Sequence, residues 1–436
     1  MPVQPSDLGG ANGLGSPARA AATLAALWLL VFTSASQTII ITPILPVIGD
    51  ELAIPERWLG TLVQVYSWAL AAAALLMGPI SDRIGRRRAL LIGAGSMALA
   101  LALHGLATSF ETLLGARLFA GLCGGMLSGA AVSYVGDAVP YEKRGWATGV
   151  VMSGVPVGIV LGVPIGRVLA AGLGFRVPFV AFAVLMGLVF VLILTVVPQP
   201  RVKLDETRMT PSSFARGYAE LLHSSDNRAA ALTYFLMYLG LGLLVAYLPI
   251  WISQTYPLGV SLFGEPLTFF GLPIDFIATL FAVGGLASVF IGPWAGALSD
   301  RTGRKPMILA SCIGLGIVTL ALTYVVRERW VLYPVYIAIM GLFALRASPL
   351  QTLMTALVPG RQRGTLMSFV IAVGQIGTGA GAVAAGFLYE AWGYRSVTFA
   401  SAATVVALAV VVWRHLPEPT AQAVDPPAAD PVPVEA

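Results

Sequence analysis

Three arginines lie inside long apolar stretches of the sequence, at Arg117, Arg167 and Arg346. A guanidinium in a medium of low dielectric constant attracts anions strongly and donates hydrogen bonds from a planar fork. The acidic residues fall at predicted helix ends, in loops or in the tails, so the sequence offers these cations no obvious buried carboxylate partner. Their chemistry would be recognition of a charged solute, or charge coupling along a path through an apolar environment.

The other reactive residue types form no catalytic or metal-binding pattern. The histidines are scattered at His104, His223 and His415, and no glycine-rich nucleotide loop follows a strand pattern. Cys123 and Cys312 fall in separate apolar segments, a placement typical of core thiols. We therefore expect no enzyme activity, no metal site and no cofactor.

The composition requires a bilayer around most of the chain. Of 436 residues, 57% are hydrophobic and 11% are charged, and the mean hydropathy is +0.83. A chain this apolar would not stay dispersed in water. Apolar runs of about 20 residues, the length that spans the hydrocarbon core, predict an all-α membrane protein with twelve transmembrane helices. The runs cover residues 22–48, 58–80, 89–108, 112–135, 147–171, 177–198, 229–252, 274–298, 307–326, 331–357, 365–388 and 397–413.

The runs divide into two pseudo-symmetric six-helix bundles, at residues 20–198 and 229–416. Residues 199–228 carry prolines, mixed charges and a short amphipathic stretch, which predicts a cytoplasmic linker. Residues 1–19 form an N-terminal tail, and residues 417–436 are rich in proline and acid, which predicts a disordered tail.

The distribution of basic residues predicts the orientation. Most Lys and Arg residues fall in the loops on the side of the N-terminus, so the positive-inside rule places both termini in the cytoplasm, with the chain in the inner (plasma) membrane. The net charge of +5 then reflects topology and lipid headgroups, and gives no reason to expect a nucleic-acid partner.

A ten-residue sequence occurs in both halves between two apolar runs, as GPISDRIGRR from Gly78 and as GALSDRTGRK from Gly296. Its glycines permit a tight turn, its arginines can face headgroups or neighbouring acids, and its aspartate suits the N-terminal end of a helix in the other half. We expect a gating role for these loops. The first copy supplies Gly78, Asp82, Arg83, Gly85, Arg86 and Arg87, and the second supplies Gly296, Asp300, Arg301, Gly303 and Arg304.

These loops resemble the signature Gly-x3-Asp-Arg/Lys-x-Gly-Arg-Arg/Lys of the major facilitator superfamily, and the resemblance covers residues 20–416. It implies a monomeric transporter that works by alternating access. It also implies that the first loop closes the cytoplasmic side, commonly with an acid at the end of helix 4, where Asp137 stands. The second copy has no equivalent acid near Val358 and Pro359.

A second resemblance concerns helix 4. Arg117 and Gly121 match the Arg-x3-Gly pattern of the drug-and-proton antiporter branch, although Ala120 replaces the usual glutamine. The GVPIG sequence at residues 162–166 is more similar to arabinose-efflux-type members. Arg117 lies close enough to the external end of its helix that snorkelling to the surface is an alternative.

The resemblance implies a central cavity lined by helices 1, 4, 7 and 10. Residues on these helices that could bind substrate or couple its movement are Gln37, Arg117, Tyr234, Tyr238, Arg346 and Gln351. The tyrosine pair could instead face lipid, and Arg346 could act as a structural strut that binds helix carbonyls.

Small residues recur every four positions on two helices that meet across the halves in the family. On helix 5 they are Gly154, Gly158, Gly162 and Gly166, and on helix 8 Gly284, Ser288, Gly292 and Gly296. Such stripes let helices approach closely in lipid. They predict a sliding surface between the bundles, although static packing needs the same pattern.

Three functions fit the sequence. The first is proton-coupled efflux of a small organic solute or drug, the second is transport of an organic or inorganic anion through Arg117 and Arg346, and the third is a non-transporting membrane sensor. No acid falls at mid-membrane, which weakens proton coupling. The titratable groups that remain lie at the margins, at Asp137, Asp275, Glu390 and His104.

Overall fold

The computed structural model describes residues 16–200, 218–262, 265–356 and 360–416. Most of the predicted N-terminal tail, the middle of the predicted linker and the predicted tail 417–436 lie outside these ranges. Val358 and Pro359, the surroundings of Gly78 and the side chains of Asp82 and Asp300 also lie outside the described part.

Twelve spans in the described residues are long and apolar enough to cross a membrane, which confirms the twelve predicted helices. Several spans consist of more than one helix, because prolines and glycines interrupt the hydrogen-bond ladder. The first half contains α1 (Pro17–Ile39), α2 (Ile41–Leu52), α3 (Glu56–Ile84), α4 (Arg86–Gly105), α5 (Phe110–Leu127), α6 (Ala130–Ala138), α7 (Tyr141–Met152), α8 (Gly154–Val157), the π-helix η2 (Gly158–Gly162), α9 (Val163–Leu173) and α10 (Arg176–Thr195). The second half contains α12 (Ser225–Thr255), α13 (Phe276–Thr302), α14 (Arg304–Val325), the 3-10 helix η3 (Arg329–Val331), α15 (Leu332–Ala356), α16 (Gly360–Trp392) and α17 (Tyr394–His415).

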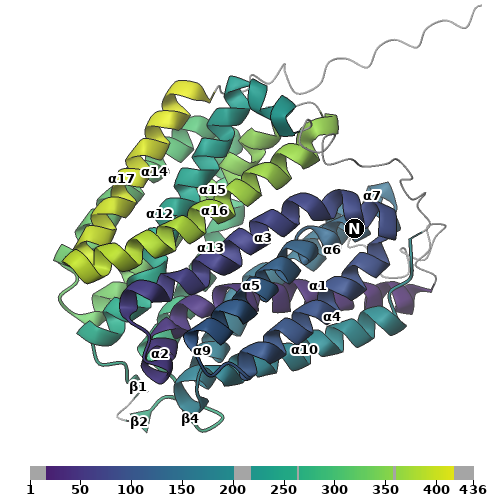
Figure 1. Ribbon diagram of the computed structural model, residues 1–436. Helices are drawn as coiled ribbons and strands as arrows, with labels where there is room; N and C mark the ends of the chain where they lie inside the picture. The colour runs from purple at the N-terminus through teal and green to yellow at the C-terminus, as the bar shows by residue number, and fades with distance from the viewer. Residues whose placement is uncertain (1–15, 201–217, 263–264, 357–359, 417–436) are drawn as a thin grey trace, which may run out of the picture.

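The two halves form two bundles that lie against each other, with α3 and α16 side by side along their boundary (Figure 1). Two small antiparallel hairpins connect α12 to α13. They pair β1 (Ser261–Leu262) with β2 (Glu265–Pro266), and β3 (Thr268–Phe269) with β4 (Leu272–Pro273). We call the end of the molecule that carries these hairpins the hairpin face, and the opposite end, where the described parts of the linker lie, the linker face (Figure 1).

The repeated loops have the same backbone conformation in both bundles. Gly85 separates α3 from α4 with φ 92° and ψ 142°, and Gly303 separates α13 from α14 with φ 90° and ψ 145°. Only glycine adopts this region without steric cost. The duplication seen in the sequence therefore reflects a repeated turn that reverses the chain on the linker face.

The bundles are in close contact on the hairpin face. A Cβ atom added at Gly60 on α3 would lie 2.1 Å from the carbonyl oxygen of Ala382 on α16. Tyr247 of the second bundle accepts a hydrogen bond from the Gly60 amide at 3.1 Å and donates one to the Glu56 carbonyl at 2.5 Å. Nearer the middle of the same pair of helices, the Trp68 indole donates to the Ile376 carbonyl at 3.1 Å. The structure is therefore closed between the bundles at the hairpin face.

The prediction that the two stripes of small residues form a sliding surface between the bundles is wrong. Cβ atoms added at Gly154 and Gly158 would meet backbone atoms of α1 at Trp28 and Phe32, inside the first bundle. Gly284 packs against Tyr336 inside the second bundle. The π-helix η2 of the first bundle and α13 of the second approach each other closely at Gly285 instead. Gly285 lies one position away from the predicted stripe and faces Ile159 and Val160 of η2. These stripes mainly hold each bundle together.

This packing makes Gly154 sensitive to substitution. A Cβ atom there would lie 2.7 Å from the Trp28 carbonyl oxygen and 2.9 Å from the Phe32 amide nitrogen. Overpacking of this kind costs about 1–3 kcal/mol, so Gly154→Val should lower the free energy of unfolding by that amount, measured by thermal unfolding of purified protein in detergent. Gly149→Val is the matched control, because an added Cβ atom there meets nothing within 4 Å. Equal losses from both variants would contradict the packing argument.

Candidate functional site

A cavity of about 860 Å³ lies between the two bundles. Its lining runs from Thr42 and Phe281, nearer the hairpin face, to Met152, Gly292 and Gln351, nearer the linker face. This volume suits a drug-sized molecule. Because the bundles meet on the hairpin face, the cavity extends toward the linker face.

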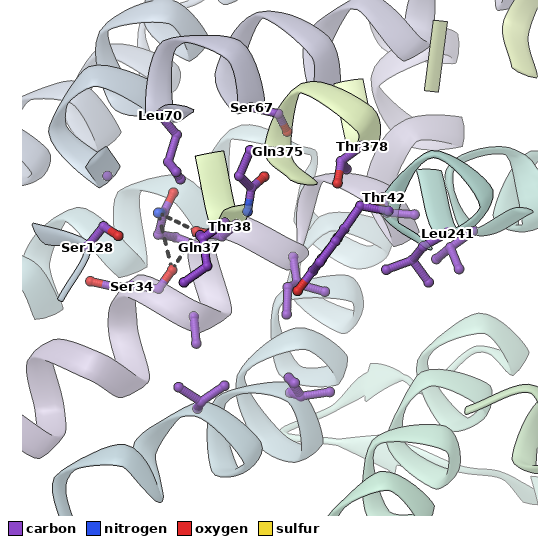
Figure 2. A pocket seen from close by; sticks show the side chains of 18 of the residues that line it. Ser34, Gln37, Thr38, Thr42, Ser67, Leu70, Ser128, Leu241, Gln375 and Thr378 are labelled. Carbon is purple, nitrogen blue, oxygen red and sulfur yellow. Dashed lines mark hydrogen bonds between the residues drawn. The ribbon is translucent and has the colours of Figure 1, made fainter. Parts of the chain in front are cut away.

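The lining is mostly apolar, with scattered hydroxyl and amide groups. Figure 2 shows Ser34, Gln37 and Thr38 on α1 facing Gln375 and Thr378 on α16 across the space. Among the described residues that line the cavity, Arg117 is the only one with a charged side chain. The cavity can therefore dissolve an apolar solute, with a few polar groups and one cation to orient it.

Arg117 is fully buried, so the snorkelling alternative is wrong. Its Nε donates to the Leu62 carbonyl at 3.2 Å, and its guanidinium carbon lies 4.2 Å from the centroid of the Tyr66 ring. The Nη1 and Nη2 atoms have no hydrogen-bond partner. A cation that borders a cavity with two unused nitrogens favours a negative or polar group nearby.

Gly121 explains how Arg117 reaches this position. A Cβ atom at Gly121 would lie 2.4 Å from the Tyr66 carbonyl oxygen, so glycine lets α5 press against α3 there. Arg117 lies four residues earlier on the same face of α5 and is thereby placed over the Tyr66 ring. The Arg-x3-Gly pattern has a packing cause in this chain.

Tyr66 links Arg117 to α1 through hydrogen bonds. The Gln37 Nε2 atom donates to the Tyr66 hydroxyl at 2.9 Å, and the hydroxyls of Thr38 and Tyr66 lie 2.8 Å apart. Gln37 also donates to the Ser34 carbonyl at 3.2 Å (Figure 2). Three helices therefore meet in one polar network at the cavity wall.

The predicted residues of the second bundle divide into two groups. Tyr238 and Gln351 line the cavity, whereas Tyr234 and Arg346 are absent from its described lining. Tyr234 is buried and stacks on Tyr238 with ring centroids 6.2 Å apart, so the lipid-facing alternative is wrong for Tyr234. Arg346 lies behind the wall, 5.3 Å from the centroid of the Phe343 ring and close to Cys312 and Tyr238.

The part of the lining that comes from α3 and α16, the second and eleventh membrane spans, was not predicted from the sequence. Tyr66 and Ser67 belong to α3, and Gln375 and Thr378 belong to α16. A signal was present, because polar residues inside apolar runs usually face protein or a cavity. The family expectation directed attention to helices 1, 4, 7 and 10 instead.

The loop after α3 makes its described contacts within its own bundle. Arg86 Nε donates to Asp137 Oδ2 at 2.6 Å and joins α4 to the end of α6, and Arg86 Nη1 donates to the Ser81 hydroxyl at 3.1 Å. Arg87 Nη2 donates to the Leu194 carbonyl at 2.6 Å, near the end of α10. The structure brings the predicted pair of Arg86 and Asp137 together, while its gating role stays a prediction.

The second copy reproduces one of these contacts. Lys305 Nζ donates to the Leu416 carbonyl at 2.9 Å, just beyond the end of α17. Both loops thus place a cation at the C-terminal end of the last helix in their bundle, where the helix dipole favours positive charge. Arg301 is exposed and Arg304 is half-buried in the same loop, with Arg83 half-buried in the first.

Arg167 has a buried carboxylate partner, which corrects the expectation that it lacks one. Its Nη2 and Nε atoms lie 2.5 Å and 2.7 Å from Asp275 Oδ2, and its Nη1 donates to the Pro43 carbonyl at 2.9 Å. Arg167 lies on α9 of the first bundle and Asp275 precedes α13 of the second. The ion pair therefore crosses between the bundles.

Comparison with protein families matches the chain to the Major Facilitator Superfamily over residues 27–272 and 230–436. The chain belongs to this superfamily. It is therefore a multi-pass membrane protein and a secondary transporter, not an enzyme.

Individual proteins agree with this assignment. The chain is 26% identical over 395 residues to "Multidrug resistance protein MdtG" of Proteus mirabilis (strain HI4320), which covers 89% of this chain and 94% of that protein. Its fold is similar to that of a D-xylose-proton symporter, with a TM-score of 0.74, 17% identity and coverage of 91% and 98% of the two chains. It is also similar to a bacterial homologue of the human lysosomal transporter Spinster, with a TM-score of 0.71, 18% identity and coverage of 94% and 99%.

Proposed function

We propose that the protein exports small, largely apolar organic solutes from the cell in exchange for protons. The observation that carries this proposal is the cavity, which has the volume of a drug-sized ligand and a lining of apolar side chains with few polar groups. The name of the similar Proteus mirabilis protein supports export of drugs. A sensor without transport would not need a cavity closed on one face and extended toward the other.

The proposed setting is the inner membrane, with a single chain as the working unit. Both halves of the cavity come from one chain, so a second copy adds nothing to the site. The excess of basic residues on the linker face supports a cytoplasmic linker face and cytoplasmic termini. In this orientation the cavity extends toward the cytoplasm, the side from which an exporter takes its substrate.

A second candidate is export of organic anions. It is favoured by Arg117, whose Nη1 and Nη2 atoms are unpaired at the wall of a cavity in which no described lining residue is acidic. Within a medium of low dielectric constant, one unneutralised cation attracts anions and repels cations. This proposal shares the cavity and the transport cycle with the first and differs in the charge of the substrate.

Flux in proteoliposomes with and without an imposed pH gradient tests both candidates. The probes are ethidium as a lipophilic cation, fluorescein as an organic anion, and a neutral lipophilic dye. Gradient-driven movement of the neutral dye supports export of apolar solutes, and additional movement of fluorescein that is lost in Arg117→Gln supports anion export. Movement of ethidium without movement of the other two probes would reject the inference that the Arg117 cation at the cavity wall excludes cationic substrates. Flux that ignores the gradient would reject proton coupling, and no flux of any probe would favour the sensor.

A further inference from the structure

The pair of Arg167 and Asp275 is the most enclosed ion pair among the described residues. The arginine side chain is 3% exposed and the aspartate side chain 11% exposed, whereas the other described ion pairs have side chains at least 20% exposed. Asp275 is also the only carboxylate that belongs to the buried residues of the described chain. A carboxylate in such a place is expensive unless it is paired, so it usually serves a function.

The geometry of the pair ties it to one conformation. Arg167 is held on the first bundle by its hydrogen bond to the Pro43 carbonyl of α2, and Asp275 caps α13 of the second bundle by accepting a hydrogen bond from the Ala278 amide at 2.8 Å. Each partner is thus fixed to its own bundle. If the bundles part on the hairpin face, the pair must separate and both groups become hydrated.

Few other ionisable groups face Asp275. On α15, the Tyr333 hydroxyl lies 2.5 Å from the Thr279 hydroxyl and interacts electrostatically with Asp275. On α9 the charged neighbour is Arg167, and on α2 the contact to the pair is the Pro43 carbonyl. On η3, Arg329 donates a hydrogen bond to the carbonyl of Gly259, which forms a β-bridge with Asp275, and it interacts electrostatically with the same Tyr333 hydroxyl. Arg167 is the cation that forms an ion pair with Asp275 among the described residues.

We propose that Asp275 is the proton-binding site that couples proton movement to the transport cycle, with Arg167 as its exchangeable counter-ion. This assignment rests on the proposed proton-coupled export. When the bundles part on the hairpin face, water reaches the Asp275 carboxylate, and Oδ2 accepts a proton from that side. When the bundles rejoin, Arg167 takes the place of the proton on Oδ2, and the proton passes to water in the cavity. Thr42, which precedes Pro43 in the chain, lines the end of the cavity nearer the hairpin face. From there the cavity extends toward the linker face.

This exchange provides what coupling requires. The proton and the guanidinium compete for one carboxylate, and the guanidinium reaches that carboxylate only while the bundles meet on the hairpin face. By linkage, protonation then favours the conformation in which the guanidinium does not compete for the carboxylate, which is the one open on the hairpin face. The ion pair observed in the closed conformation is the deprotonated end of this cycle.

Arg57 and Glu390 form a matched control pair within the same molecule. They also join the two bundles on the hairpin face, at a distance of 3.5 Å, but their side chains are 44% and 47% exposed. Both of their charges remain hydrated whether the pair forms or not, so it contributes little. Neutralising Glu390 therefore removes an interbundle ion pair without removing a buried proton site.

The test measures opening of the hairpin face against pH in the full chain reconstituted in lipid. Spin labels at Thr108→Cys and Arg327→Cys, two exposed loop positions in different bundles, report the distance by pulsed EPR in a background with Cys123→Ala and Cys312→Ala. In the otherwise unchanged protein, the long-distance population should grow by about tenfold relative to the short one from mildly alkaline to mildly acidic pH. Asp275→Asn and Asp275→Ser should show the long distance at every pH. Both variants can still cap α13, so correct folding is checked by monodispersity.

Glu390→Gln should retain the pH response, and Asp275→Glu should retain at least part of it. The proposal is overturned if the labelled protein does not respond to pH, if Asp275→Asn and Asp275→Ser respond as it does, or if Glu390→Gln abolishes the response equally. Measurement of export driven by a pH gradient distinguishes failure of the Asp275 assignment from failure of the proposed function. If the unchanged protein ignores the pH gradient, the proposed function fails. If Asp275→Asn still exports solute in response to the gradient, only the assignment of Asp275 fails.

Discussion

Replacement of Arg117 by glutamine is expected to lower the initial rate of solute export by about 10- to 100-fold, the equivalent of one lost hydrogen bond to a charged group. Arg117 is the only charged side chain among the described residues that line the cavity, and two of its nitrogens have no partner there. Glutamine is shorter and neutral, so it can neither attract an anionic group nor stack on the Tyr66 ring. The measurement is export from proteoliposomes at equal amounts of monodisperse protein.

Two further variants separate the roles of charge and stacking. Arg117→Lys keeps the positive charge but loses the planar guanidinium that lies 4.2 Å from the Tyr66 ring centroid, so it should restore only part of the rate. Tyr66→Phe keeps the ring and removes the hydroxyl that Gln37 and Thr38 contact, so it should have a smaller effect than Arg117→Gln. An Arg117→Gln protein that exports every probe at the normal rate would show that the cavity does not use this cation.

The sequence predicted the twelve spans and the repeated turns because both depend on local physical properties. Apolar length determines which segments cross lipid, and the positive φ at Gly85 and Gly303 requires glycine whatever the rest of the chain does. Arg117 was predicted as part of the site from the resemblance of Arg117 and Gly121 to the family pattern, and the structure supplies a local physical reason for that pattern. Its motif partner Gly121 lies four residues away, and the contact that Gly121 permits positions the arginine directly.

The pair of Arg167 and Asp275 could not be predicted in the same way. The two residues are 108 positions apart and meet only because two bundles close against each other. Asp275 is the second residue of the predicted apolar run 274–298, so in the sequence it resembles an ordinary helix cap at the edge of the membrane. Its burial depends on α9, which packs against α13 but is distant from Asp275 in the sequence. No local sequence pattern therefore indicates this burial.

Helix periodicity could have separated Arg346 from the cavity. The described lining of α15 consists of Met340, Phe343, Ala344, Ala347, Ser348 and Gln351. Their spacing of three and four residues defines one face of a helix. Arg346 lies five residues before Gln351, which turns it well away from that face. The interpretation that placed both residues in the cavity used depth in the membrane and ignored this angle.

The position of Arg346 behind the wall leads to a prediction about stability. Its side chain is 1% exposed, and its Nε and Nη1 atoms have no hydrogen-bond partner. A buried guanidinium at mid-membrane costs about 3 kcal/mol, and the aromatic contact with Phe343 and the nearby thiol of Cys312 offset only part of this. Arg346→Met fills a similar volume without charge, so it should raise the free energy of unfolding by up to about 3 kcal/mol, measured by thermal unfolding in detergent.

Arg395→Met is the matched control, because Arg395 is exposed and its guanidinium carbon lies 5.0 Å from the centroid of the Tyr324 ring. The same substitution there removes an exposed charge and should change stability by less than about 0.5 kcal/mol. A clear loss of stability in Arg346→Met would instead identify the arginine as a structural strut. A gain in stability together with lost fluorescein export would mean that the buried charge is retained for transport. In that case Phe343 or Tyr238 must move for a solute to reach it, because both side chains line the cavity in front of the guanidinium.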